Sequence, residues 1–333
     1  MKDEITFCRT GFLWLFLKGM ERVYPGSIES LSLPNTLLCN KMRLMPVSEI
    51  LRCFSELRER TGDDMFVIKG GKEIILSDYP SLSYPIDTSQ DLFTAIMRLN
   101  SLVAVFQSGT ESITTRSANI LKWCYNVPSI TGDERLYDSI VAVWVFIHIL
   151  KSFHSTTYTP VRILLPGSKL GKSGEVDALF GCAVDWNQKE AQVWFPYEDV
   201  VKRNPKPNNQ PYDFKMDKLE IMTYIDLPKS NDFLRCIYEL INYAKEFEFP
   251  NLNFIASIIE ISPQQLQRKL QKKQISFTAL VNHQLLCNQA PNLLPLHGIE
   301  VVANKLGYKN AQSFTKAFKR VHGLTPRQYL EDV

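Results

Sequence analysis

The spacing of apolar residues predicts that helices and strands are mixed along the first two hundred residues. Apolar positions at intervals of three and four are typical of helices, and short β-rich runs bounded by turn residues are typical of strands. The expected helices are Phe7–Met20, Val47–Thr61, Ser89–Gln107, Glu134–Phe153 and a short one near Val176–Phe180, and the expected strands are Ser112–Tyr125, Val161–Leu165, Cys182–Trp186 and Gln192–Phe195. Because no β-α-β rhythm repeats, the pattern favours an α+β domain with an antiparallel sheet.

The pattern changes at a proline-rich segment. Residues 202–211 contain three prolines and three asparagines, which continue neither a helix nor a central strand. Beyond Asn231 no β pattern remains, and the rest of the chain is predicted to be helical. We therefore expect a first domain at residues 1–210, a linker at 211–229 and an all-α domain at 230–333.

The helical third contains a short helix, a tight turn and a second helix with strong start signals. The first helix is expected at Leu252–Ile259 and the second at Pro263–Lys272. Ser262 is a favourable N-cap, Pro263 suits the first helical position, and Gln265 stands where a capping box places Glu or Gln. The inner face carries Leu266 and Leu270, and the opposite face is polar, with Gln264, Gln267, Arg268 and Gln271.

The residue types on that polar face are those that recognise bases in duplex DNA. Glutamine can form two hydrogen bonds with adenine, and arginine two with guanine. Lys269, Lys272 and Lys273 suit phosphates. The alternative is an ordinary solvated helix face, so this unit taken alone leaves DNA binding open.

The same arrangement occurs a second time, which favours DNA binding. Ile299–Leu306, a turn at residues 307–310 and Ala311–Val321 repeat the short helix, turn and second helix. Phe314 and Phe318 form the inner face, and the outward residues are Gln312, Ser313, Thr315, Lys316, Lys319 and Arg320. With Ser276–Ala290 as a connecting helix, the two units could enter successive major grooves, about 34 Å apart.

Charge and reactive residue types indicate binding rather than catalysis. Residues 250–333 carry 10 Lys+Arg and 4 Asp+Glu, whereas residues 1–249 carry 28 and 31, so the basic end is suited to a polyanion. The 7 cysteines and 5 histidines have neither disulfide nor metal-ligand spacing. We expect no enzyme activity, no cofactor and no metal, with reduced cysteines that are mostly buried.

Several short motifs in the helical third are typical of one protein family. In the second unit they are Ala303–Tyr308, Ser313-Phe314, Ala317–Arg320, Gly323–Pro326 and Gln328-Tyr329, and in the first unit Ile255-Ala256, Ser262-Pro263, Leu266–Arg268, Leu270 and Ser276-Phe277. These motifs, which cover residues 231–333, resemble the signature of the AraC/XylS family of bacterial transcription regulators.

The resemblance implies which residues contact double-stranded DNA. The base-reading positions correspond to Gln264, Gln265, Gln267 and Arg268 in the first unit and to Ala311, Gln312, Ser313, Thr315 and Lys316 in the second. Lys272 and Lys319 complete the set as expected phosphate contacts. The resemblance further implies a sequence-specific regulator, in most cases an activator that contacts RNA polymerase.

Three departures from the family pattern concern how the two units are set relative to each other. Leu285 stands where the family usually has arginine, and Gln289 where it usually has alanine. Pro291 is expected to shorten the connecting helix, and residues 296–298 give the second unit a poor cap. Simultaneous docking of both units is therefore left open.

Residues 1–200 resemble the arabinose-binding-type N-terminal domain found in a subset of this family. The resemblance rests on residues 61–64, the helix near Ser89–Leu102, residues 180–184 and residues 194–196. It implies that the domain senses a small-molecule effector, forms homodimers, or does both. It names no ligand.

Two other functions remain open from the sequence. The segment from Pro166 to Ser173 looks like a phosphate-binding loop, which would make the protein a nucleotide-binding enzyme or switch with the helix-turn-helix units as a targeting module. Against this, Pro166 stands where the loop needs glycine, and proline has no N–H to donate. The other alternative is a regulator without an effector, controlled by its abundance.

Two apolar runs are candidates for a signal peptide or a membrane segment. Phe12–Leu17 is followed by charged residues and lacks the features of a signal peptide. Ile140–Leu150 spans eleven residues, against roughly 20 needed to cross a bilayer. We expect both to be buried helices of a cytoplasmic protein with no membrane partner.

Overall fold

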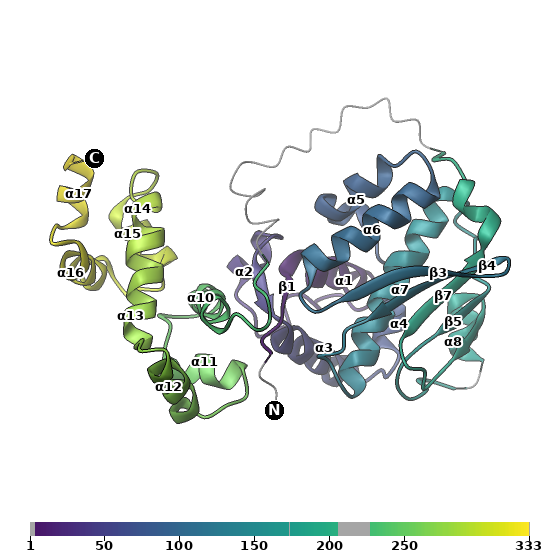
Figure 1. Cartoon of the computed structure of the whole chain (residues 1–333), viewed down its shortest axis with the longest axis horizontal. Coiled ribbons are helices and arrows are strands. Elements are labelled where there is room, and N and C mark those ends of the chain that lie inside the picture. Colours follow the sequence, from purple (N-terminus) through teal and green to yellow (C-terminus); the bar gives the residue numbers. More distant parts are fainter. Residues whose placement is uncertain (1–3, 173, 206–226, 333) are drawn as a thin grey trace.

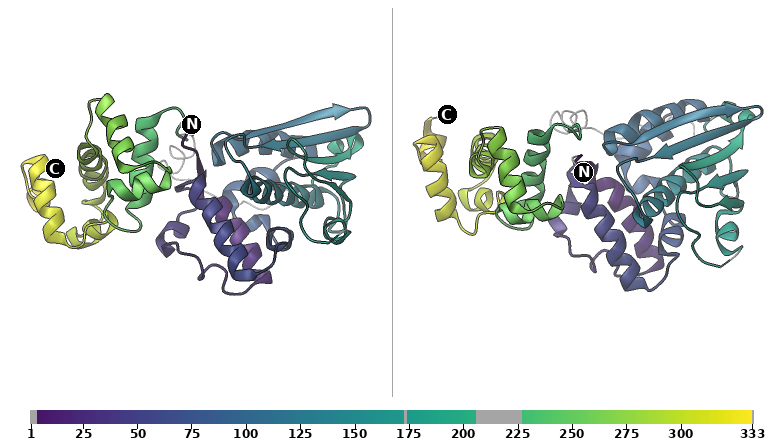
Figure 2. Two further views of the ribbon diagram at one scale, coloured as in Figure 1. Left: turned by 90° about the horizontal axis from the view of Figure 1, so that it is seen from below. Right: turned by 60° about the horizontal axis from the view of Figure 1, so that its bottom comes forward.

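The computed structural model describes residues 4–172, 174–205 and 227–332. An α+β domain comes first and is followed by a domain built of helices alone (Figure 1). Figure 2 shows the helical domain at one side of the α+β domain, with the N-terminus at the junction between them. The predicted fold class is confirmed. The predicted linker at 211–229 lies almost entirely outside the described residues.

The larger sheet of the α+β domain has five strands in the order β3-β4-β7-β5-β6. Neighbouring strands are antiparallel except for the parallel pair β5 and β6. β6 and β7 follow each other in the chain, but β5 lies between them in the sheet. The strands are β3 (Glu111–Ser117), β4 (Ile120–Asn126), β5 (Arg162–Leu164), β6 (Ala183–Asp185) and β7 (Ala191–Pro196).

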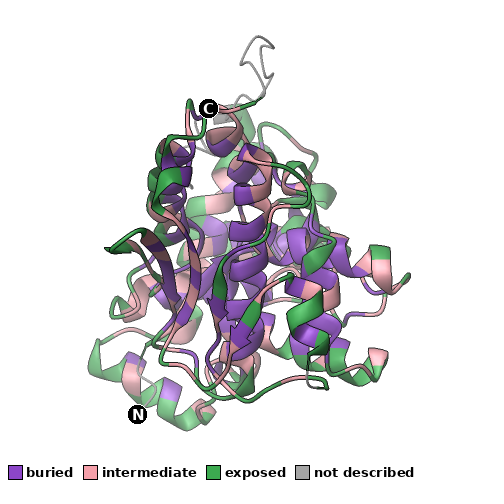
Figure 3. Ribbon diagram, turned by 90° about the vertical axis from the view of Figure 1, so that its right-hand side faces the viewer, coloured by how far each residue is buried: buried purple, intermediate pink, exposed green. Residues whose placement is uncertain are grey.

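Helix α7 (Asp133–Phe153) is the centre of this domain. One side packs on β4 and β7, where the ring of Phe146 stacks on Trp123 with centroids 4.4 Å apart. The other side packs on α3 and α4. By length and composition the helix could cross a membrane, but 78% of its apolar 18-residue stretch is buried inside the protein. Figure 3 shows that buried ribbon is concentrated in the middle of the molecule, and the burial of α7 is that of a core helix.

The remaining helices of the domain surround α7 and the sheet. They are α1 (Thr10–Val23), α2 (Asn35–Cys39), α3 (Val47–Thr61), α4 (Phe66–Lys72), α5 (Pro80–Asp87), α6 (Leu92–Phe106), α8 (Glu175–Phe180) and the short 3-10 turns η1 (Leu76–Asp78) and η2 (Tyr197–Val201). The helix predicted at Phe7–Met20 begins later than expected, because Phe7–Arg9 forms strand β1 and pairs with β2 (Leu44–Pro46). The cysteines are free, and four of the seven are buried.

The second domain is entirely helical over its described residues, as predicted. Its helices are α10 (Phe233–Ala244), α11 (Leu252–Ile258), α12 (Pro263–Lys272), α13 (Phe277–Asn282), the π-helical turn η3 (His283–Gln289), α14 (Ala290–Leu293), α15 (Ile299–Lys305), α16 (Ala311–His322) and α17 (Pro326–Asp332).

The expectation that Pro291 shortens the connecting helix is wrong. Helical structure continues from α13 through η3 and α14 to Leu293, two residues past the proline. Pro291 lies inside this continuous helix, just after the π-helical turn η3. Proline removes one backbone N–H from a helix, and the π-turn before it already departs from the regular α-helical hydrogen-bond pattern, so the helix continues past the proline.

The first half of the helical domain is tied to the α+β domain. The Tyr243 hydroxyl donates a buried hydrogen bond of 2.7 Å to Glu49. The Ser48 hydroxyl donates to the Ile258 carbonyl at 3.0 Å, and Arg43 pairs with Glu246 at 2.5 Å. Among the described residues, no hydrogen bond or ion pair joins α15–α17 to the α+β domain. The first helix-turn-helix unit is therefore tied directly to the α+β domain. The second unit packs instead on the connecting helix and on the segment between α10 and α11, where the Tyr308 ring lies 4.8 Å from that of Phe249.

Candidate DNA-binding interface

The first unit consists of α11 and α12, both of which are capped by side chains. The Asn251 side chain accepts a hydrogen bond from the Phe254 amide at 2.8 Å at the start of α11. At the start of α12, Ser262 accepts from the Gln265 amide at 3.2 Å, and the Gln265 side chain accepts from the Ser262 amide at 2.8 Å. This is the predicted capping box, and it fixes where α12 begins.

The outer face of α12 presents the predicted polar residues. Leu266 and Leu270 are buried on the inner face. Opposite them, the side chains of Gln264, Gln267, Arg268, Gln271 and Lys272 are exposed. Helical spacing places Gln265 and Lys269 on the flank. Gln265 is exposed, but its carbonyl oxygen is engaged in the cap, and Lys269 is half-buried 5.9 Å from the Phe233 ring.

The second unit consists of α15 and α16. Gly298 caps α15 without a side-chain hydrogen bond, as predicted from residues 296–298. The turn between the helices needs Gly307, which has a φ of +77° and where a Cβ would lie 3.1 Å from the Glu248 carbonyl oxygen. The Asn310 side chain then accepts from the Ser313 amide at 2.8 Å, so α16 itself is well capped.

The outer face of α16 is more basic than that of α12. Phe314 and Phe318 are fully buried on its inner face. The exposed residues are Gln312, Ser313, Lys316, Lys319 and Arg320. Ala311 and Thr315 are half-buried on the flank. The structure therefore brings together nine of the eleven predicted contact residues as exposed side chains, and leaves these two beside the core.

The residues that depart from the family pattern are accommodated in the connecting helix. Leu285 is fully buried. Gln289 accepts a hydrogen bond from the Lys245 ammonium at 2.6 Å and donates to Asn242 at 2.6 Å, both on the α10 side. Burial lowers the pKa of Lys245 to about 8. Gln289 thus joins the connecting helix to α10 and provides a hydrogen-bond acceptor for a half-buried lysine. This role depends on tertiary contacts and leaves no sequence signal.

Helix α12 lies near the start of the connecting helix, and α16 packs on its middle at η3 (Figure 1). Helical residues run from Phe277 to Leu293, which corresponds to a rod about 25 Å long at the rise of an α-helix. Neither α12 nor α16 contains an acidic residue. Two recognition helices without negative charge suit a DNA duplex, whose phosphates attract cations.

The loop that resembles a phosphate-binding loop gives no support to nucleotide binding. The Asn187 amide donates to the Gly167 carbonyl at 2.9 Å and the Gln188 amide to the Leu165 carbonyl at 3.0 Å, so the segment is tied to a neighbouring turn. The helix that follows, α8, has six residues. Pro166 also lacks the N–H that a phosphate would need there.

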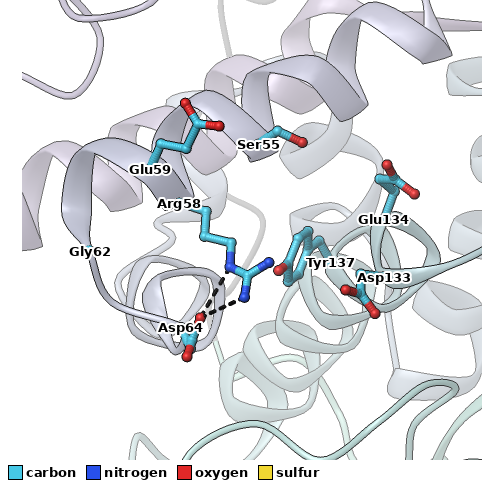
Figure 4. Close-up of a pocket in the computed structure, with 8 residues that line it drawn as sticks. All are labelled: Ser55, Arg58, Glu59, Gly62, Asp64, Asp133, Glu134 and Tyr137. Carbon is cyan, nitrogen blue, oxygen red and sulfur yellow. Dashed lines mark hydrogen bonds and ion pairs between the residues drawn. The ribbon is translucent and has the colours of Figure 1, made fainter.

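The described residues contain no group of three or more metal-ligating side chains. His148 is half-buried in α7, and its ring nitrogen Nε2 lies 3.2 Å from the Gly71 carbonyl oxygen. A surface depression of about 450 Å³ lies between α3 and the start of α7 (Figure 4). In it, Arg58 makes an ion pair of 2.9 Å with Asp64 beside the ring of Tyr137.

Two known families match this chain, one in each of its two domains. Residues 28–204 match the family described as the arabinose-binding domain of AraC transcription regulator, N-term. Residues 255–332 match the family described as helix-turn-helix domain.

Curated relatives match the helix-turn-helix part. The uncharacterized HTH-type transcriptional regulator Rv1395 of Mycobacterium tuberculosis is 34% identical over 83 residues, which are 24% of this chain and 24% of that protein. The HTH-type transcriptional regulator GadX of Escherichia coli K12 is 32% identical over 79 residues, 23% of this chain and 28% of GadX. The matches thus span about a quarter of these relatives' length. The crystal structure of transcriptional regulator CdpR from Pseudomonas aeruginosa is 16% identical, with a TM-score of 0.44 over 96% of this chain and 97% of that one.

Proposed function

The chain belongs to the AraC family of transcription regulators, with a helix-turn-helix DNA-binding domain and an N-terminal ligand-binding domain, and on this premise we propose that α12 is its main sequence-reading element. The observation that carries the proposal is the outer face of α12, where Gln264, Gln267 and Arg268 are exposed on a helix fixed by a capping box. In the proposed complex these three side chains contact base edges and Lys272 contacts a phosphate. Gln265 keeps the helix start in place and has its amide nitrogen left for DNA.

The second unit has a supporting role in this proposal. Gln312, Ser313 and Lys316 reach bases, and Lys319 reaches the phosphate backbone. Ala311 and Thr315 contact DNA at most through their exposed edges, since both are half-buried. The outer face of α16 carries three cations, Lys316, Lys319 and Arg320, against two on that of α12, which favours affinity over base discrimination.

Replacing Arg268 with alanine is expected to weaken binding to the specific site by about 1–3 kcal/mol, because a two-bonded contact with a base is lost. Preference at one base position should relax, while non-specific affinity changes little. Footprinting titrations on the native site and on sites substituted at each position measure both effects.

Replacing Lys319 with alanine is expected to weaken binding to all sequences alike. Each phosphate contact contributes about 0.9 to the slope of log affinity against log salt concentration. The slope should therefore fall by about that amount, and base preference should stay unchanged. Titrations at four or five salt concentrations on specific and random duplexes give both quantities.

Arg327→Ala is the control for both variants, since it removes one charge from an exposed residue of α17, outside the two recognition helices. It should leave base preference intact and reduce the salt slope less than Lys319→Ala. Unchanged affinity and preference in Arg268→Ala would show that α12 does not read bases.

The activating role, the partners and the domain limits also belong to this proposal. The family membership supports activation through RNA polymerase, a cytoplasmic location, and effector sensing or homodimer formation by residues 1–210, with a linker at 211–229 and the DNA-binding domain at 230–333. Transcription from a target promoter with purified RNA polymerase tests the first point. Sedimentation equilibrium of the full chain tests whether it is a dimer.

A further inference from the structure

A cavity of about 710 Å³ lies between the two domains. The α+β domain lines it with residues 4–6, Pro46, α3, residues 129–131 and Glu134 of α7. The helical domain lines it with Phe233, α11, the turn after α11 and Lys269. Ligand sites in proteins have volumes of roughly 300–1,000 Å³ and occur preferentially at domain interfaces. The size and place of this cavity are those of a small-molecule site.

The lining combines an apolar surface with an excess of negative charge. Phe233, Phe254 and Ile261 supply apolar surface from the helical domain, and Ile130 supplies it from the other side. The ionisable residues of the lining are four carboxylates and two cations: Glu4, Glu49, Glu134, Glu260, Arg52 and Lys269.

Some of these charges already have partners. Glu49 pairs with Arg52 at 2.8 Å and also accepts the Tyr243 hydrogen bond, and Arg52 reaches Glu56 at 3.6 Å. Within the described part of the chain, neither Glu4 nor Glu134 has an ion-pair partner. Glu134 is half-buried in the first turn of α7. The charge left over in the cavity is therefore negative.

We propose that this interdomain cavity binds a small organic cation, namely a primary amine on an apolar skeleton. The ammonium group pairs with Glu134, and the apolar skeleton packs on Phe233, Phe254 and Ile261. The inference rests on the proposed function, in which the N-terminal domain controls the DNA-binding domain through a ligand, and adds the chemical class and the place of that ligand.

The position of the cavity explains how such a ligand would act on DNA binding. Phe254 and Ile261 belong to the first helix-turn-helix unit, and Lys269 lies on α12 itself. A bound amine touches both domains, so it favours the arrangement in which the first unit is held against the α+β domain. Its effect falls on the first unit, because α15–α17 contribute no residue to the cavity lining.

Calorimetric titration of the full chain tests the proposal, with 2-phenylethylamine as probe and 3-phenylpropanoate as its counterpart of similar shape and opposite charge. We expect saturable binding of the amine and at least tenfold weaker binding of the carboxylate. Glu134→Gln should weaken amine binding at least tenfold. The matched control Glu59→Gln removes the same charge from α3 at the neighbouring depression and should leave amine binding unchanged.

Three results would overturn the proposal: no saturable amine binding to the folded chain, equal binding of amine and carboxylate, or equal losses in the two variants. The melting temperature of each variant without ligand shows that it is folded. DNA affinity without amine separates this inference from the proposed function. If Glu134→Gln loses amine binding but keeps DNA binding, the amine site is confirmed, whatever the result for Arg268→Ala. If Glu134→Gln keeps amine binding while Arg268→Ala loses base preference, the amine site is rejected and the proposed function stands.

Discussion

Replacing Phe318 with alanine is expected to destabilise the second helix-turn-helix unit by about 3–5 kcal/mol, the usual loss for a fully buried phenylalanine. Its ring stacks on His322 at 4.1 Å and meets Tyr329 edge-on at 5.4 Å, so it joins α16 to α17. The first unit is held by α10 and the α+β domain and should stay folded. The expected outcome is a shorter DNA footprint that retains the contacts of α12.

Hydrogen exchange of the backbone amides measures this effect element by element. In Phe318→Ala, protection should fall in α15–α17 and remain in α7 and α12. Val321→Ala is the control, because Val321 lies on the same helix and is 36% exposed, so its change should stay within about 0.5 kcal/mol. A full-length footprint and unchanged protection of α16 in Phe318→Ala would contradict the independence of the two units.

Replacing Asp138 with asparagine is expected to raise the stability of the α+β domain at pH 7 by up to about 3 kcal/mol. Asp138 is buried in α7 and accepts hydrogen bonds from the Tyr125 hydroxyl at 2.9 Å and the Gln107 amide at 3.4 Å. Burial raises the pKa of its carboxyl group to about 6. The native domain therefore has to bury a charge at pH 7 that asparagine does not carry.

The sign of the pH dependence follows from that raised pKa. The folded state holds the Asp138 proton more tightly than the unfolded state, so protonation of Asp138 stabilises the fold. This stabilisation is complete below about pH 4 and is lost as the pH rises through about 6. Urea unfolding at pH 4 and pH 7 should show a gain from Asp138→Asn at pH 7 and little at pH 4. The control Asp64→Asn removes an exposed ion pair and should change stability by less than about 1 kcal/mol. A gain of equal size at both pH values would exclude the charge as its cause.

The helices that sequence patterns predicted best are those with explicit start signals. Helix α12 has the predicted bounds because Ser262, Pro263 and Gln265 specify its first turn, and α3 has the predicted bounds after Pro46. Helices α4 and α5 were not predicted. Both helices contain poor helix formers, namely Gly70 and Gly71 in α4 and Pro85 in α5. Only tertiary packing explains why these two segments are helical. A Cβ on Gly19 would collide with the Gly70 carbonyl, and one on Gly71 with the Trp144 ring.

The candidate site was predictable to the extent that it depends on local structure. Exposure of the outer faces of α12 and α16 follows from helical spacing. The half-burial of Ala311 and Thr315, the position of Lys269 toward the domain interface, and the bridge from Gln289 to Lys245 depend on neighbours distant in the sequence. The insertion of β5 between β7 and β6 is of the same kind, since strand order is not encoded in the spacing of any one segment.

The π-helical turn in the connecting helix has a consequence for how the protein measures its target. A π-turn accommodates one residue more than an α-helical turn does. Relative to an uninterrupted α-helix of the same sequence, everything beyond that residue is rotated by about 100° and set back by about 1.5 Å along the axis. The angular phase between the two recognition helices thus depends on a single residue within His283–Gln289. If both helices dock on one duplex, the same residue determines the spacing of the two DNA sites that one molecule reaches.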